Sequence, residues 1–257
     1  MAALITGASS GIGLELARLF AADGVDLVLV ARRTERLEKL KIELEHRYKI
    51  NAHVIASDLS LSQSPEEVFA ETKRMGLEID CLVNNAGFGQ LGEFSEIDWQ
   101  KEADMIQLNV IALTHLTKLY LPEMLAKGRG RILNVASTAA FQPGPLMAVY
   151  FATKAYVLSF SSAIAEELRN TGVTVTTLCP GPTASEFQMV ADMENVSMLK
   201  RRKLPTSAEV AEYGYNAMKK GKRIAIPGFS NKLLAFSTRF ATTKMLTRIV
   251  HKLNKPA

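Results

Sequence analysis

Cysteine and histidine are scarce in this sequence, which has two cysteines and four histidines in 257 residues. Cys81 and Cys179 fall at or near the ends of predicted strands, and neither has a partner at ligand spacing. We therefore predict that both are small buried apolar side chains. The histidines are scattered along the chain, so we predict no metal site and no redox role for these residues.

The sequence also lacks targeting segments and a strong charge bias. No apolar run reaches the length of a transmembrane span, and the first seven residues enter a predicted strand without the layout of a signal peptide. We therefore predict a cytoplasmic protein. The net charge of +5 is too modest for a dedicated nucleic-acid binder, although it favours anionic ligands.

Internal repeats, low-complexity linkers and a clear domain boundary are absent too. Strand-like apolar runs alternate with helix-like segments, which predicts an α/β fold: a single-domain, Rossmann-type doubly wound parallel sheet of about seven strands, with helices on both faces. We predict a catalytic domain over residues 1–228, with a substrate lid at about 186–206, and a basic amphipathic tail over 229–257. Strands are expected at 2–6, 26–31, 51–57, 81–83, 131–136, 173–178 and 223–226.

Capping patterns and a proline indicate where helices begin or break. Ser64–Glu67 and Thr206–Glu209 fit the capping box, so each is expected to start a helix. The segment 97–127 is predicted to be helical, with Pro122 bending or interrupting it. Asn109 lies in an apolar part of that segment, where its amide needs partners, and it is either a satisfied core group or a functional one.

A glycine-rich turn joins the first strand to the first helix. Gly7, Gly11 and Gly13 have the spacing Gly-x-x-x-Gly-x-Gly, which differs from the Gly-x-Gly-x-x-Gly dinucleotide fingerprint. Glycine allows unusual backbone angles and close approach of a ligand, while a helix start offers free N–H groups and a favourable dipole. The turn is therefore predicted to bind phosphate, and the alternative is a tight turn without a ligand.

Two arginines follow the second strand. In a doubly wound sheet this strand end lies beside the adenosine ribose of a bound dinucleotide, where a carboxylate favours NAD and an arginine accommodates the 2′-phosphate of NADP. Arg32 and Arg33 therefore predict NADP as the cofactor. The alternative is that they simply open an exposed helix at 34–48.

A serine, a tyrosine and a lysine form the pattern with the clearest chemical meaning. Ser137 follows a predicted strand, and Tyr150 and Lys154 are four residues apart in a predicted helix, so that their side chains share a face. A nearby ammonium lowers the pKa of a tyrosine, which favours proton transfer to a carbonyl oxygen. Tyr215 and Lys219 have the same spacing without an upstream serine, and such a pair alone indicates only a half-buried tyrosine beside a solvated lysine.

Together these motifs resemble the short-chain dehydrogenase/reductase family over about residues 2–227. The shared motifs, in the family's order and approximate spacing, are Thr6–Gly13, Asp58, Asn84–Gly87, Asn109, Ser137, Tyr150, Lys154 and Pro180–Gly181. The resemblance implies an oxidoreductase that interconverts a ketone and a secondary alcohol. Tyr150 would be the general acid/base and Ser137 would hold the substrate oxygen. Lys154 would bind the nicotinamide ribose and lower the pKa of the tyrosine, and Asn109 would support a proton path.

The resemblance also implies the cofactor contacts. They are expected in the glycine turn, at the end of the second strand and in the loops after later strands, namely at Gly7, Ser9, Ser10, Gly11, Ile12, Gly13, Arg32, Arg33, Asp58, Leu59, Asn85, Ala86, Gly87, Tyr150, Lys154, Pro180, Gly181, Thr183 and Ser185. Ser185 stands where the family usually has threonine. The segments 136–145 and 179–183 resemble those of a poorly assigned, ketoacyl-reductase-like bacterial branch of the family. However, Ile226–Gly228 replaces the glycine-rich tail of many oxoacyl reductases. The resemblance therefore does not by itself imply an oxoacyl substrate.

The segment 186–204 lies where this family closes over its substrate, and it is rich in methionine and other apolar residues. It predicts an adaptable apolar pocket for a hydrophobic ketone or acyl-type substrate. The predicted substrate contacts are Phe88, Ser137, Phe141, Tyr150 and Phe187. The alternative is that the apolar residues pack the lid onto its own body. The basic run 200–203 is either a solvated turn or a binding site for a phosphate-bearing carrier.

The tail carries an apolar stripe, with basic residues elsewhere on the predicted helix. The stripe consists of Met245, Leu246, Ile249, Val250 and Leu253. We predict packing on the protein's own body or on another subunit, and peripheral attachment to an anionic membrane is the second interpretation. A homodimer or homotetramer formed through helices around 97–125 and 150–169 is expected from the family. Two rival functions are an isomerase or dehydratase of the same fold, and a non-catalytic NADP-sensing or membrane-docked interaction protein.

Overall fold

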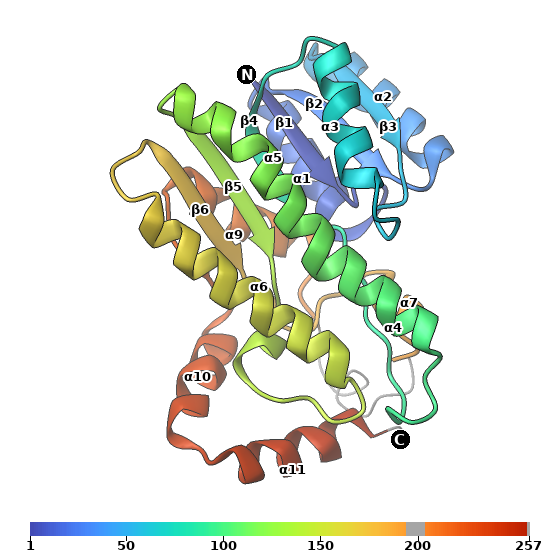
Figure 1. The fold of residues 1–257 in the computed structure, drawn as a ribbon, viewed down its shortest axis with the longest axis vertical. Helices are drawn as coiled ribbons and strands as arrows, with labels where there is room; N and C mark the ends of the chain where they lie inside the picture. The colour runs from blue at the N-terminus through green and yellow to red at the C-terminus, as the bar shows by residue number, and fades with distance from the viewer. Residues whose placement is uncertain (194–203, 256–257) are drawn as a thin grey trace.

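Seven parallel strands form one central sheet in the computed structural model, which describes residues 1–193 and 204–255 (Figure 1). The strand order is β3-β2-β1-β4-β5-β6-β7, so the chain reverses direction across the sheet between β1 and β4. Ligands bind at such a reversal in open α/β sheets. The predicted fold is confirmed, with strands β1 (Ala2–Thr6), β2 (Asp26–Ala31), β3 (Ala52–Ala56), β4 (Ile79–Asn84), β5 (Gly130–Val135), β6 (Val173–Leu178) and β7 (Ile224–Ala225).

Helices connect the strands and extend the chain beyond β7. They are α1 (Gly11–Ala22), α2 (Thr34–Tyr48), α3 (Ser64–Arg74), α4 (Trp99–Ile106), α5 (Leu113–Ala126), α6 (Ala148–Glu167), α7 (Phe187–Val190), α9 (Ser207–Lys219), α10 (Phe229–Ser237) and α11 (Thr243–Asn254). A π-helical segment, η1 (Gln107–Ala112), joins α4 to α5, and two 3-10 turns are η2 (Thr138–Phe141) and η3 (Thr238–Phe240). The basic run 200–203 and part of the predicted lid lie outside the described residues.

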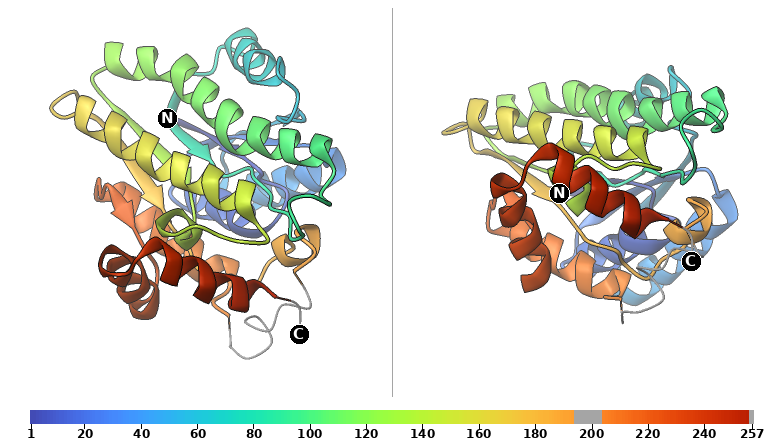
Figure 2. Two further views of the ribbon diagram at one scale, coloured as in Figure 1. Left: turned by 60° about the horizontal axis from the view of Figure 1, so that its bottom comes forward. Right: turned by 90° about the horizontal axis from the view of Figure 1, so that it is seen from below.

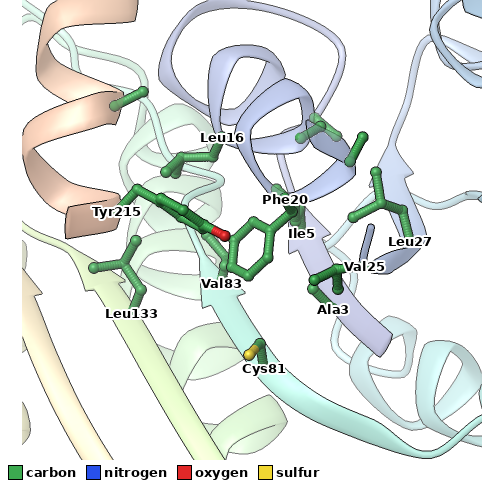
Figure 3. Close-up of a cluster of buried hydrophobic side chains, with 14 of the residues drawn as sticks. Ala3, Ile5, Leu16, Phe20, Val25, Leu27, Cys81, Val83, Leu133 and Tyr215 are labelled. Carbon is green, nitrogen blue, oxygen red and sulfur yellow. The ribbon is translucent and has the colours of Figure 1, made fainter. Parts of the chain in front are cut away.

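Two apolar clusters cover the two faces of the sheet. On one face, Ala3 and Ile5 of β1 pack with residues of α1, α2 and α9, and Phe20 meets Tyr215 edge-on at 4.8 Å between ring centroids (Figure 3). On the other face, Leu4 packs with residues of α3, α5 and α6. Successive side chains of a strand point to opposite faces, so a short, wholly buried strand such as β1 contributes to both layers.

The prediction that Ser64 caps a helix is wrong, and of the two alternatives for Pro122 the structure excludes interruption. Ser64 is not an N-cap, because the preceding Gln63 already has helical backbone angles and the Ser64 N–H is bonded to the carbonyl of Leu61. The capping box at Thr206 and Glu209 is present as predicted. Pro122 lies inside α5 without interrupting it. It sits on the exposed side of the helix, where water can satisfy the carbonyl that loses its N–H partner.

One described helix, α6, is long and apolar enough to cross a membrane by length and composition alone, although the sequence predicted no run of that length. Seven of its residues are buried within the fold, among them Lys154 and Ser161. A helix in the core of a globular domain can pass the same test, so this property identifies no span.

The tail turns back over the sheet. Figures 1 and 2 show α11 lying across the end of the molecule to which the strands β5 and β6 point. Val250 of α11 is buried in a cluster with Met147 and Tyr150, and the Asn254 side-chain amide donates to the carbonyl of Pro145 at 2.9 Å. The inner face of α11 therefore packs on the protein's own body.

Candidate active site

A cavity of about 580 Å³ opens at the carboxyl ends of the central strands. Its volume is within the range of about 300–1,000 Å³ that is common for ligand sites. We call the part lined by residues 7–12, 30–33 and 57–59 the glycine end. The part lined by Met147, Phe187 and Val250 is the apolar end. Lys154, Tyr150 and Ser137 also line the cavity.

Most of the predicted site residues lie together in this cavity. Those that line it are Gly7, Ser9, Ser10, Gly11, Ile12, Arg32, Arg33, Asp58, Leu59, Asn85, Ala86, Gly87, Phe88, Ser137, Tyr150, Lys154, Pro180, Gly181, Thr183, Ser185 and Phe187. Gly13, Asn109 and Phe141 do not line it. Phe141 instead packs against a separate apolar cluster with Leu113, Val157 and Cys179, so the structure removes it from the predicted pocket.

The glycine turn leaves backbone N–H groups available at the start of α1. Gly7 and Gly11 have φ angles of +67° and +57°, which side-chain-bearing residues rarely adopt. Ser10 is the N-cap of α1 but makes no side-chain hydrogen bond to the helix. A Cβ on Gly13 would lie 2.4 Å from the carbonyl oxygen of Gly7, so Gly13 permits close packing of helix on turn. This geometry fits a phosphate group.

A hydrogen-bonded link holds the turn against the end of β4. The Asn85 side-chain amide donates to the carbonyls of Thr6 at 2.9 Å and Gly7 at 3.3 Å. In return, the Thr6 hydroxyl accepts from the backbone amides of Asn85 and Ala86 at 2.9 and 3.0 Å. These bonds fix the turn against the end of β4, beside the cavity.

The arginines after β2 form an anion-binding cluster that the sequence predicted only in part. Arg33 donates to the hydroxyls of Ser9 and Ser10, at 3.1 and 2.8 Å. It also pairs with Glu186 at 2.7 Å, and Arg36 pairs with the same carboxylate at 2.6 Å. Hydrogen bonds from Arg36 and then Arg33 lower the pKa of Glu186 to about 2, so it is a carboxylate at any ordinary pH.

Arg36 and Glu186 were missed because their roles depend on position in space. Arg36 lies one turn into α2, three residues after Arg33, and looks like any exposed helix arginine. Glu186 is 153 residues from Arg33. By contrast, the predicted Arg32 is 72% exposed in its side chain and lies 3.8 Å from Asp58.

Asp58 is an ionised carboxyl at the same edge. Burial alone would raise its pKa, but hydrogen bonds from Ser60 and the charge of Arg32 outweigh burial and lower it. Asp58 therefore stays negatively charged, and both Asp58 and Leu59 line the glycine end of the cavity.

Ser137, Tyr150 and Lys154 meet between the two ends of the cavity. Ser137 caps η2 by accepting from the amide of Ala139 at 3.1 Å, which fixes its hydroxyl after β5. Lys154 donates to the carbonyl of Val135 at 2.9 Å and lies 5.8 Å from the centroid of the Tyr150 ring. A hydroxyl, a phenol and an amine thus share one wall.

The predicted effect of Lys154 on Tyr150 is wrong in this structure. Burial raises the pKa of Tyr150 to about 12, and the hydrogen bond with Ser137 offsets only part of that. Burial also lowers the pKa of Lys154 to about 8. Burial therefore dominates the pKa of Tyr150, while the Lys154 amine donates to the Val135 carbonyl.

Asn109 lies behind the cavity in the π-helical segment η1 and is 1% exposed. Its amide donates to the carbonyl of Phe88 at 2.9 Å and to the Thr153 hydroxyl at 3.1 Å, and its oxygen accepts from the amide of Phe88. Asn109 thus ties the loop after β4 to α6 at Thr153, the residue immediately before Lys154. Its partners satisfy both halves of the amide.

The apolar end combines the lid with the tail. The ring centroids of Phe187 and Tyr150 are 5.4 Å apart, and Met147 is buried next to them. Val250 and Leu253 of α11 complete the lining. The sequence predicted the aromatic contacts from Phe88 and Phe187 but not the contribution of α11.

The other residues after β6 lie at the junction of cavity and tail. Ser185 donates to the carbonyl of Thr183 at 3.4 Å, so its hydroxyl is used within the loop. A Cβ on Gly181 would come within 2.7 Å of the Asn231 side chain of α10, so glycine lets the tail pack closely here.

The second tyrosine–lysine pair lies away from the cavity. Tyr215 donates to Asp23 at 2.8 Å, and Lys219 pairs with the same carboxylate. Neither residue lines the cavity, so the pair has the structural role expected of the spacing alone.

Comparisons with known proteins show the family to which the chain belongs. Residues 1–195 match the family model described as short chain dehydrogenase. The chain is 36% identical over 183 residues to the uncharacterized oxidoreductase YvrD of Bacillus subtilis, covering 71% of this chain and 68% of that protein. It is 37% identical over 179 residues to a very-long-chain 3-oxoacyl-CoA reductase of Phaeosphaeria nodorum, covering 67% of this chain and 52% of that protein. The chain thus spans about half the length of that reductase.

A solved structure gives the same overall match. The short-chain dehydrogenase from Sphingobium yanoikuyae in complex with NADPH superposes with a TM-score of 0.84 at 31% identity, covering 93% of each chain.

Proposed function

The chain belongs to the short-chain dehydrogenase family, an oxidoreductase family, and on that premise we propose that it interconverts a ketone and a secondary alcohol with NADP(H). One observation carries the proposal: Ser137, Tyr150 and Lys154 line the same cavity as the glycine turn. A cofactor held at the glycine turn would therefore lie beside the proton-transfer groups, together with the substrate. A nicotinamide cofactor, when bound, supplies or accepts the hydride.

Tyr150 is the residue proposed to move the proton. With a pKa of about 12 it keeps its proton at neutral pH, so it can give that proton to an oxygen that becomes negative during reduction. The Ser137 hydroxyl is proposed to hold the same oxygen. Lys154 is proposed to bind the ribose and to supply positive charge next to the phenol as the oxyanion develops.

The choice of NADP over NAD is proposed from the arginine cluster. Arg33 and Arg36 already hold a carboxylate, that of Glu186, at the end of β2. A 2′-phosphate has the same sign and more acceptor oxygens, and guanidinium groups bind it in a fork geometry. Arg32, which is mostly exposed, would add a further contact.

The proposed substrate is a hydrophobic ketone or acyl-type molecule. Met147, Phe187 and Val250 at the apolar end offer a surface without charge. The similarity to a very-long-chain 3-oxoacyl-CoA reductase supports this class. A homodimer or homotetramer and a cytoplasmic location stay predictions; Ile111, Leu125 and Tyr156 are exposed apolar side chains on the helices expected to form the subunit contacts.

The test is a cofactor titration followed by a ketone panel. NADPH and NADH are titrated by fluorescence into wild type and into Arg32→Ala/Arg33→Ala protein, and we expect tight NADPH binding that the double variant loses. NADPH consumption is then measured with ketones graded from small and polar to large and apolar. Equal affinity for both cofactors would refute the NADP assignment, and turnover of small polar ketones alone would refute the substrate class.

A further inference from the structure

The outer side of the tail is apolar although it faces solvent. Eight of the nineteen exposed large apolar side chains among the described residues lie between 229 and 253. Phe229, Leu233, Phe236 and Phe240 recur at helical spacing along α10 and η3, and the rings of Phe236 and Phe240 pack at 5.2 Å. Phe229 is 82% exposed and Phe240 is 78% exposed. Isolated exposed apolar residues are common, but a continuous row of this size indicates a binding surface.

The helix α11 carries a second exposed apolar face. Val250 and Asn254 are buried on the inner face of α11. Met245 and Ile249 are exposed, and Ile249 lies about 100° round the helix from Val250. We call the exposed apolar side chains of α10, η3 and α11 the tail surface: Phe229, Leu233, Phe236, Phe240, Met245 and Ile249. Figure 1 shows both helices at the edge of the molecule farthest from the N-terminus.

The charge of the tail has one sign. Residues 229–257 include six lysines and arginines and no aspartate or glutamate, so the remaining 228 residues have a net charge of −1. These six cations flank the tail surface: Lys232, Arg239, Lys244, Arg248, Lys252 and Lys255. In the described part of the chain, none of the six forms an ion pair with a carboxylate. The tail therefore combines an apolar row with unpaired positive charge.

The tail surface also borders the cavity. Leu234 and Leu253 line the cavity and are each 39% exposed, so they lie at its rim, between the lining and the tail surface. Val190 of the lid lines the cavity and is exposed as well. A body that covered the tail surface would thus reach the mouth of the apolar end.

We propose that α10, η3 and α11 dock this protein on an anionic lipid bilayer, with the rim of the cavity beside the lipid. Helices with a large aromatic row and a basic flank lie in the interface of such a bilayer, where the row enters the acyl boundary and the cations meet the headgroups. A second copy of this chain fits the surface less well. A twofold interface brings a surface against itself, so six cations would face six cations.

Docking would also give an apolar substrate a direct path from lipid to cavity. This consequence depends on the proposed function, whereas docking itself does not. The experiment therefore measures membrane binding without turnover. A failure of the docking proposal is then distinguishable from a failure of the proposed function.

The test is co-sedimentation of the full-length protein with vesicles of phosphatidylcholine that contain about 30 mol% phosphatidylglycerol, and with vesicles of phosphatidylcholine alone. We expect binding to the anionic vesicles that weakens in 0.5 M salt, because screening shortens the reach of the charges to roughly 3–5 Å. The variant Lys244→Gln/Arg248→Gln/Lys252→Gln should bind roughly a hundredfold more weakly. Each removed charge contributes about 1 kcal/mol of binding free energy, and about 1.4 kcal/mol corresponds to a tenfold change in affinity.

Matched variants separate the tail from net charge and general hydrophobicity. Lys39→Gln/Lys41→Gln/Lys49→Gln removes three charges from α2 and its end, away from the tail (Figure 1), and should bind like wild type. Phe236→Ser should weaken binding by roughly tenfold, whereas Phe94→Ser, at another exposed phenylalanine, should not. Thermal unfolding and NADPH binding check that each variant is folded.

Three results would overturn the proposal. The first is absence of binding to the anionic vesicles, and the second is equal loss of binding in the tail and α2 variants. The third is a change of subunit number in sedimentation velocity when the tail surface is altered, with vesicle binding unchanged, because the surface would then be a subunit interface.

Discussion

The two ends of the cavity are built in different ways. The glycine end is made mainly by one short stretch of chain, residues 7–33, whose backbone turn and N-terminal helix amides form the surface. The apolar end is made by side chains from segments far apart, as in the bond between Asn254 and Pro145, which are 109 residues apart. The glycine end uses backbone geometry, and the apolar end uses side-chain volume.

This difference suggests that the two ends can change independently. A turn that binds phosphate depends on φ angles and close backbone approach, so few residues can replace its glycines. An apolar wall depends on volume, and one aliphatic side chain can replace another at modest cost. Cofactor affinity and substrate preference should therefore respond to different substitutions along the cavity.

The largest effect is expected where the two ends meet. Tyr150→Phe removes the phenolic proton donor and leaves the ring against Phe187, so turnover of a ketone should fall about 10²–10⁴-fold. NADPH affinity should change little, because the hydroxyl is not part of the glycine end. Single-turnover NADPH oxidation measures the first quantity and fluorescence titration the second. A turnover loss below tenfold would show that another group delivers the proton.

The next prediction concerns pH and Lys154. Its pKa falls from 10.5 in the unfolded chain to about 8 in the folded protein because of burial. Between these values the unfolded chain binds more protons than the folded protein, so the free energy of unfolding rises with pH through this window. Denaturant unfolding of wild type and Lys154→Met at pH 7.5 to 9.5 should show this rise in wild type alone, within about 1–3 kcal/mol. Parallel curves for the two proteins would contradict the lowered pKa.

Arg33 tests the glycine end alone. Arg33→Ala should weaken NADPH binding by roughly ten- to hundredfold, the usual effect of losing a charged hydrogen-bond donor, and leave NADH binding nearly unchanged. The ketone KM should stay within about twofold of wild type. Arg47→Ala, at another arginine of α2, is the control for the loss of one charge. Equal weakening of NADPH and NADH would mean that Arg33 supports the turn instead of recognising a 2′-phosphate.

The same contrast explains which parts of the site could be predicted from the sequence. The glycine turn, Arg33 and the Ser137, Tyr150 and Lys154 pattern could be predicted, because their geometry follows from spacing on a strand end or helix. The position of Phe141 was wrong, because η2 turns the side chain into a neighbouring apolar cluster. The pKa of Tyr150 was wrong in direction, since burial depends on the whole fold and not on the nearest charge.

The fold was predicted more completely than the tail. Apolar runs of strand length alternating with helices determine a parallel sheet, whichever residues occupy individual positions. The stripe on α11 predicted a packed face but not its partner. Val250 could not be assigned to the cavity from the sequence, because 100 residues separate it from Tyr150 and no local pattern links them.

Val250 tests the apolar end in the same way. Val250→Ala should lower kcat/KM for a hydrophobic ketone by roughly five- to tenfold, because two buried methyl groups leave the cavity wall. NADPH affinity should not change. Val157→Ala removes the same groups from a buried position that does not line the cavity, so it should reduce stability without altering the order of preferred ketones. A shift of ketone preference in both variants would show a general softening of the core.

The smallest effect is expected at Glu186, which lies where the glycine end adjoins the lid. It pairs with Arg33 and Arg36 at the glycine end and precedes Phe187 of the apolar end. A 2′-phosphate and this carboxylate seek the same donors, so Glu186→Gln should raise NADPH affinity by about two- to fivefold, the size of an exposed ion pair. NADH affinity should not change, and Glu38→Gln on α2 is the charge control. A fall in NADPH affinity would mean that Glu186 holds the arginines in their binding positions, and the two ends would then be coupled instead of independent.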